Sequence, residues 1–134
     1  ALAVQSHGSV DLARRTRAAL ARVGLEGLEG QEAQTLSYGH QRLLELAMGL
    51  ALNPRVLILD EPTQGLAASE IDSFTRLVEG LVPETTVLLI EHNMEVVMDL
   101  ATRITVLNFG QVLASGTPAE IRANPVVQEA YLGA

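Results

Sequence analysis

The sequence contains neither cysteine nor lysine among its 134 residues. Without cysteine, the chain forms no disulfide, carries no thiol nucleophile and offers no thiolate to a metal, and it suits a reducing compartment. All nine basic residues are arginines, set against sixteen carboxylates, which gives a formal net charge of −7. A phosphate-binding loop of the form GxxxxGK[ST] needs a lysine, so this sequence cannot contain one.

Aromatic residues are also scarce, at 3% of the chain with no tryptophan. Proteins bind nucleic acids through basic patches that neutralise phosphates and through aromatic rings that stack on bases. The acidic balance and the lack of a basic stripe provide neither feature. We therefore expect no nucleic acid among the partners.

Long hydrophobic runs are absent as well. The longest, residues 56–59 and 87–90, are far shorter than the roughly 20 residues that span a bilayer. The first residues, ALAVQSHGSV, lack the charged start and apolar stretch of a signal peptide. At 48% hydrophobic content the chain has enough apolar material for a folded core. It starts without Met inside an apolar pattern, which favours a fragment of a longer protein.

The spacing of apolar residues predicts a helical part followed by an α/β part. Helices are expected over residues 11–23 and about 38–52, with Gly24 ending the first and Ser37 capping the second. From Val56 the pattern changes to the β-branched run VLILD, typical of a strand buried on both faces of a parallel sheet. An amphipathic helix over 69–82 and a second buried strand over 86–90 complete a βαβ unit, so the predicted fold class is α/β.

The remaining third of the chain predicts a helix, a hairpin and two more helices. A helix follows His92 to about residue 101, and strands over 104–108 and 111–114 form a hairpin across Phe109 and Gly110. Thr117, Pro118 and Glu120 are a strong helix start. A short helix is expected over 126–132.

Two carboxylates, Asp60 and Glu61, follow the first predicted strand. Open α/β sheets bind ligands at the carboxyl ends of their strands. Asp60 there can hold the hydrated Mg²⁺ of a nucleotide, and Glu61 can orient or deprotonate the attacking water. The alternative is a polar turn before Pro62, because short motifs of this kind often occur by chance.

Two further elements carry groups that can meet a phosphate. Ser37 and Gly39 stand at a helix start, where backbone N–H groups and the helix dipole favour an anion; the alternative is an ordinary cap and turn. His92 directly follows the second strand and can reach a terminal phosphate; the alternative is a cap for the next helix. No histidine has another within metal-motif spacing, which argues against a zinc site.

Together these elements resemble the nucleotide-binding domains of ABC transporters. LSYGH resembles their LSGGQ signature, VLILDEP their Walker B strand with the adjoining catalytic glutamate, and LLIEH their switch-histidine strand. The resemblance implies a partial P-loop NTPase (ABC ATPase) fold with part of the helical subdomain. Residues 1–53 would be a helical-subdomain portion ending in the signature and its helix. Residues 54–134 would be the C-terminal part of the RecA-like ATPase core.

The resemblance also implies roles for the site residues, with ATP and Mg²⁺ as cofactors. The signature residues would contact ATP bound by a second ATPase subunit, identical or not. Asp60 would hold Mg²⁺ through its water shell. Glu61 would contact the attacking water, and His92 would contact the γ-phosphate. The signature residues concerned are Ser37, Tyr38, Gly39 and His40.

The chain departs from the family pattern in two places. Tyr38 and His40 replace Gly and Gln in the signature, and residues 63–67, which resemble the D-loop, have Ala67 where Asp is usual. The backbone contacts of the signature should survive these changes. The change at Ala67 puts coupling between subunits in doubt.

The C-terminal run from EHNMEVVMDL to VVQEAYLGA resembles the ATPase subunits of branched-chain amino acid importers. It implies permease subunits and, indirectly, a solute-binding protein as partners, and a cytoplasmic position on the inner face of the membrane. Importers of urea or other amides and lipopolysaccharide-export ATPases share parts of this pattern, which leaves the cargo open. A non-transport ABC ATPase in translation or DNA maintenance is the alternative, as is a catalytically silent interaction module. Because no phosphate-binding loop is present, these residues alone are expected to be inactive.

Overall fold

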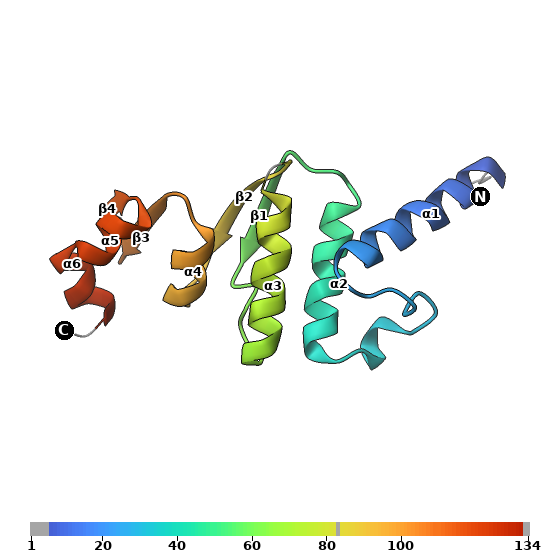
Figure 1. Cartoon of the computed structure of the whole chain (residues 1–134), viewed down its shortest axis with the longest axis horizontal. Helices are drawn as coiled ribbons and strands as arrows, with labels where there is room; N and C mark the ends of the chain where they lie inside the picture. The colour runs from blue at the N-terminus through green and yellow to red at the C-terminus, as the bar shows by residue number, and fades with distance from the viewer. Residues whose placement is uncertain (1–5, 83, 133–134) are drawn as a thin grey trace. The chain divides into compact units, whose positions relative to one another are not determined.

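The computed structural model describes residues 6–82 and 84–132 of the chain. Contacts between residues divide it into two compact units, the first ending at Ile90 and the second beginning at Glu91. This division falls inside the second predicted domain, so the domain boundary at residue 53 stays a prediction. Figure 1 labels the elements of each unit in chain order.

The first unit begins with α1 (Ser6–Arg22), the 3₁₀ turn η1 (Ala33–Thr35) and α2 (Tyr38–Leu50). The predicted start of α1 at Asp11 was too late, because the helix forms from Ser6 without an acidic residue in its first turn. Gly24 ends it as predicted, with a φ of 74°. Apolar side chains of α1, α2 and the segment after α1 are buried: Ala19, Leu20, Val23, Leu25, Leu46, Ala47 and Leu50.

The predicted βαβ unit is present in this first unit. Strand β1 (Val56–Asp60) leads through α3 (Ala68–Leu81) to β2 (Thr86–Ile90). The strands are parallel, with Val56 opposite Thr86 and Asp60 opposite Ile90. The α/β fold class predicted from the sequence is confirmed.

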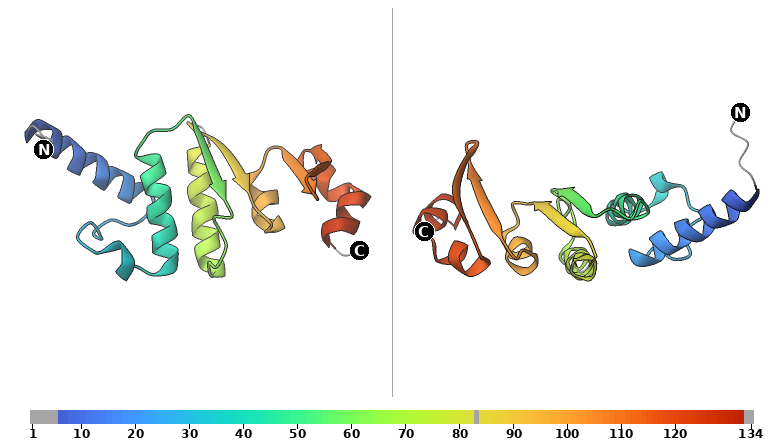
Figure 2. Two further views of the ribbon diagram at one scale, coloured as in Figure 1. Left: turned by 180° about the vertical axis from the view of Figure 1, so that it is seen from behind. Right: turned by 90° about the horizontal axis from the view of Figure 1, so that it is seen from above.

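The prediction that both strands are buried on both faces was wrong for the part of the chain that the structure describes. Helix α3 lies along one face of the pair and buries Phe74, Val78 and Leu81 (Figure 2). The opposite face carries apolar side chains that are 48 to 62% exposed: Val56, Ile58, Leu88 and Ile90. Composition shows that these residues are apolar, but only the packing of neighbouring layers decides whether both faces are covered.

The second unit contains α4 (Met94–Leu100), β3 (Ile104–Asn108), β4 (Gln111–Gly116), α5 (Pro118–Ala123), α6 (Pro125–Val127) and the π turn η2 (Gln128–Leu132). Strands β3 and β4 form the predicted antiparallel hairpin. Its turn residues, Phe109 and Gly110, both have positive φ. A small core joins the hairpin to α5 and α6 through Ile104, Val106, Ile121 and Val127.

Candidate functional site

Asp60 and Glu61 lie at the carboxyl end of β1, as the sequence predicted. Asp60 is the last residue of the strand and is exposed, whereas Glu61 is half-buried. The Glu61 N–H donates to the carbonyl of Ile90 at 2.8 Å, so this turn is fastened to the end of β2. The Glu61 carbonyl accepts from the N–H of Gln64 at 3.2 Å. The chain therefore reverses tightly at the point where the sheet presents its two carboxylates.

The backbone of Glu61 is strained. Its φ is 44°, in the left-handed region that costs a residue with a Cβ about 1–2 kcal/mol. Glu61 also precedes Pro62, a position where the backbone is normally extended. Strain of this kind persists only where the surroundings enforce it, and it concentrates at functional sites. Glu61 was predicted from its position after the strand, but no local residue pattern signals this conformation.

The signature turn (residues 36–40) forms the start of α2. Ser37 is the N-cap, and its hydroxyl accepts from the N–H of His40 at 3.2 Å. The side-chain amide of Gln41 donates to the carbonyl of Leu36 at 3.1 Å and closes the turn. Gly39 is buried, whereas Tyr38 and His40 are exposed. Two side-chain hydrogen bonds thus close the turn at the N-terminus of a 13-residue helix.

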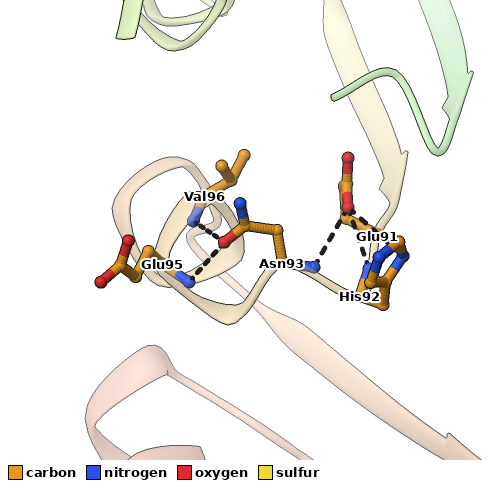
Figure 3. Close-up of polar contacts among 5 residues, drawn as sticks. All are labelled: Glu91, His92, Asn93, Glu95 and Val96. Carbon is orange, nitrogen blue, oxygen red and sulfur yellow. Dashed lines mark hydrogen bonds and ion pairs between the residues drawn. The ribbon is translucent and has the colours of Figure 1, made fainter. Parts of the chain in front are cut away.

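Figure 3 shows the polar contacts around His92, in the segment that leads into α4. The side chain of the neighbouring Glu91 is fully buried, and its carboxylate accepts the N–H groups of His92 at 3.0 Å and Asn93 at 3.1 Å. The Nδ1 atom of His92 lies 3.9 Å from the same carboxylate, and its side chain is 67% exposed. Glu91, a buried acid next to His92, was not among the residues predicted from the sequence.

The alternative role for His92, capping the following helix, is wrong. Asn93 is the N-cap of α4, and its side-chain oxygen accepts the N–H groups of Glu95 at 3.2 Å and Val96 at 3.4 Å (Figure 3). Asn93, and not His92, is therefore the N-cap of α4. Asp60 and Glu61 belong to the first compact unit and His92 to the second.

The donor set at β1 suits a weakly held, hydrated cation. Within residues 6–82 and 84–132, no group of three or more histidine or carboxylate side chains is placed to hold a metal. Mg²⁺ keeps several of its waters and is bound by one or two carboxylates together with substrate phosphates. A single exposed carboxylate, Asp60, fits that mode of binding and does not fit a cage built from protein ligands alone.

None of the helices in the described part of the chain is long and apolar enough to cross a membrane.

Two protein families match the sequence. The family described as ABC transporter matches residues 2–64, and the family described as branched-chain amino acid ATP-binding cassette transporter matches residues 111–134. The chain is 47% identical over 116 residues to the high-affinity branched-chain amino acid transport ATP-binding protein BraF of Pseudomonas aeruginosa, covering 85% of this chain and 46% of that protein. The corresponding LivG protein of Escherichia coli is 46% identical with the same coverage. The zinc import ATP-binding protein ZnuC of Paracoccus denitrificans is 40% identical, covering 85% of this chain and 45% of that protein.

Solved structures of ABC transporter components also resemble the chain. An ATP-binding cassette of an ABC transporter in its ADP conformation superposes with a TM-score of 0.81 at 26% identity, covering 92% of this chain and 51% of that one. The structure of cbiO1 from Clostridium perfringens, part of the ABC transporter complex cbiONQ, superposes with a TM-score of 0.78 at 29% identity, covering 91% and 49%. The chain thus spans about half the length of the relatives it matches.

Proposed function

The chain belongs to the ATP-binding domains of ABC transporters, and we propose that it provides the signature and Walker B half of the ATPase site in a branched-chain amino acid importer. The support is the order and placement of three elements. The signature turn begins α2, the carboxylates Asp60 and Glu61 end β1, and His92 follows β2 after one residue. This order and placement support the proposed site.

We propose the following roles in the intact ATPase subunit. Glu61 orients and deprotonates the attacking water, for which a carboxylate at the end of a parallel strand is well placed. Asp60 holds Mg²⁺ through its water shell, and the bound ion neutralises charge on the phosphates. His92 contacts the terminal phosphate. The signature turn contacts ATP bound by a second ATPase subunit, through Ser37, Tyr38, Gly39 and His40.

The proposed cargo and partners rest on the relatives. The proteins of Pseudomonas and Escherichia that match over 85% of the chain are named for branched-chain amino acid transport, and so is the family that matches residues 111–134. We therefore propose permease subunits as direct partners and a solute-binding protein as an indirect one. The subunit would then act in the cytoplasm, on the inner face of the membrane.

A reconstitution experiment tests the cargo. The intact subunit would be assembled with its permease in vesicles, and ATP hydrolysis measured with the solute-binding protein and leucine, isoleucine or valine. We expect these amino acids to stimulate hydrolysis, while zinc and urea do not. Stimulation by another solute and not by these three would contradict the proposed cargo. Absence of hydrolysis under every condition would contradict the proposed ATPase.

A further inference from the structure

Two segments of the first unit are in contact with each other. One is the signature turn, and the other is the loop of residues 63–67 between β1 and α3. Helices α2 and α3, which begin at these segments, lie side by side in Figures 1 and 2. One close contact joins the two segments directly, a second joins the signature turn to the first turn of α3, and each involves a glycine.

The first contact is between Tyr38 and Gly65. A Cβ atom built on Gly65 would lie 2.9 Å from Cε1 and 3.5 Å from Cζ of the Tyr38 ring. Real Cβ atoms essentially never come that close, so the ring occupies the place of a side chain at Gly65. The φ of Gly65 is +78°, which also favours glycine. The ring therefore packs directly against the backbone of the loop.

The second contact is between Gly39 and Glu70. A Cβ atom on Gly39 would collide with the Glu70 carboxylate, whose Cδ would be only 2.7 Å away. The same carboxylate accepts the N–H of Ala67 at 2.8 Å. Glu70 thus lies between the end of the loop and the start of α2, where a negative charge is favourable next to the helix N-terminus.

The Tyr38 ring is itself held in place from its own helix. Its hydroxyl accepts from Nε of Arg42 at 3.2 Å and from Nη2 at 2.9 Å. The guanidinium carbon lies 5.2 Å from the ring centroid, and Nη1 donates to Glu45 at 2.8 Å. The ring is fixed at its hydroxyl end by α2 and at its edge by Gly65.

We propose that Tyr38 is a positioning residue that fixes the loop of residues 63–67 to the signature turn of the same subunit. The loop and the signature turn would then contact the second ATPase subunit together, held in a fixed arrangement. This inference rests on the proposed function. Ala67 has no polar side chain with which to anchor the loop, and its N–H is already bound by Glu70. The ring against Gly65 supplies an anchor that does not depend on Ala67.

Loop mobility tests this directly and needs no ATP turnover. A spin label would be placed at Gln64, which is exposed, in the intact subunit with any other cysteines replaced by serine. We expect Tyr38→Gly to increase the motion of the label, because it removes the ring. Tyr38→Phe should leave the label as immobile as in the wild type, because it keeps the ring and loses only the hydroxyl. Met48→Ala, at an exposed position of the same helix, is the control.

The same variants show whether Tyr38 positions the loop or only stabilises the folded subunit. Tyr38 is 48% exposed, so Tyr38→Gly opens little buried space and should stay folded, with a melting temperature at most a few degrees below the wild type. The turnover number of Tyr38→Gly should fall by on the order of ten- to a hundredfold, because the loop is misplaced. The cooperativity of ATP hydrolysis should also be reduced. An equally immobile label in Tyr38→Gly, or equal release in Tyr38→Phe, would overturn the inference. An inactive wild-type subunit with the expected label motions would refute only the proposed function.

Discussion

Three non-glycine residues hold a left-handed backbone in the described part of the chain: Asn53, Glu61 and Phe109, with φ between 44 and 48°. They differ in what surrounds them. Glu61 is half-buried at the proposed catalytic turn, whereas Phe109 is 99% exposed at the tip of a hairpin. A substitution at Phe109 can therefore relieve the backbone strain without loss of packing. Its effect on stability then reports the cost of the left-handed backbone alone.

We expect Phe109→Asn to stabilise the protein. The two-residue turn of Phe109 and Gly110 has positive φ at both positions, the geometry in which Asn-Gly is preferred. Relief of the strain should raise the free energy of unfolding by about 0.5–1 kcal/mol. Chemical denaturation measures this, and Phe109→Leu is the control because it keeps the strain. An equal gain in both variants would show that exposure of the ring, and not the backbone, was responsible.

At the level of elements, we expect the stability of the α5 start in the second unit to depend on pH. The N–H of Thr117 donates to the Glu120 carboxylate at 2.7 Å, and the Thr117 hydroxyl lies 3.0 Å from the same oxygen. The backbone hydrogen bond first, and the hydroxyl second, lower the pKa of Glu120 below its ordinary value. Because the pKa is lower in the folded state, ionised Glu120 stabilises the fold above its unfolded pKa. That stabilisation is lost as the pH falls through the folded pKa.

We therefore expect wild type and Glu120→Gln to differ in unfolding free energy at neutral pH and to converge in acid. Denaturation across a pH series measures the difference. Thr117→Val, which removes the hydroxyl but keeps the N–H, should retain most of the pH dependence. A difference between wild type and Glu120→Gln that persists unchanged in acid would assign the effect to packing.

Elements with a strong local signal could be predicted from the sequence. The run VLILD, the amphipathic pattern of α3 and the Thr117 to Glu120 start all gave the right element, because their cause lies within a few residues. The apolar pattern of β1 and β2 does not by itself show which face is exposed, because that depends on which layers cover the sheet. The Tyr38 contact with Gly65 joins segments far apart in sequence, and no local pattern shows it.

At the scale of the whole molecule, we expect the exposed apolar face of β1 and β2 to act as an association surface. The described residues place these strands in a two-stranded sheet, and isolated pairs of strands are marginally stable. We expect the 134-residue chain to self-associate through this face and the strand edges.

Light scattering over a concentration series measures that association. Ile58→Thr together with Leu88→Thr should weaken it, because both side chains lie on the exposed face. Leu52→Thr should not, because Leu52, although 79% exposed, lies outside the sheet. A compact monomer at high concentration, with amides of both strands protected from exchange, would be incompatible with this prediction.

We also expect the 134 residues alone not to bind ATP tightly. The loop that holds the β- and γ-phosphates in P-loop ATPases requires a lysine, and the sequence has none. Calorimetry with ATP and Mg²⁺ should show no binding in the low micromolar range, with the intact subunit as the positive control. Magnesium-dependent turnover by the chain alone would show that its phosphate contacts come from residues we have not identified.

The most direct test of the proposed ATPase site is hydrolysis by Glu61→Gln in the intact subunit. The substitution keeps the size of the side chain at the end of β1 and removes the base. We expect turnover to fall by at least on the order of a hundredfold. ATP binding should be preserved, and the ATP-bound dimer should accumulate. Glu84→Gln, at an exposed glutamate between α3 and β2, should leave turnover unchanged. Near-normal hydrolysis by Glu61→Gln would contradict the account, because the base would then lie elsewhere.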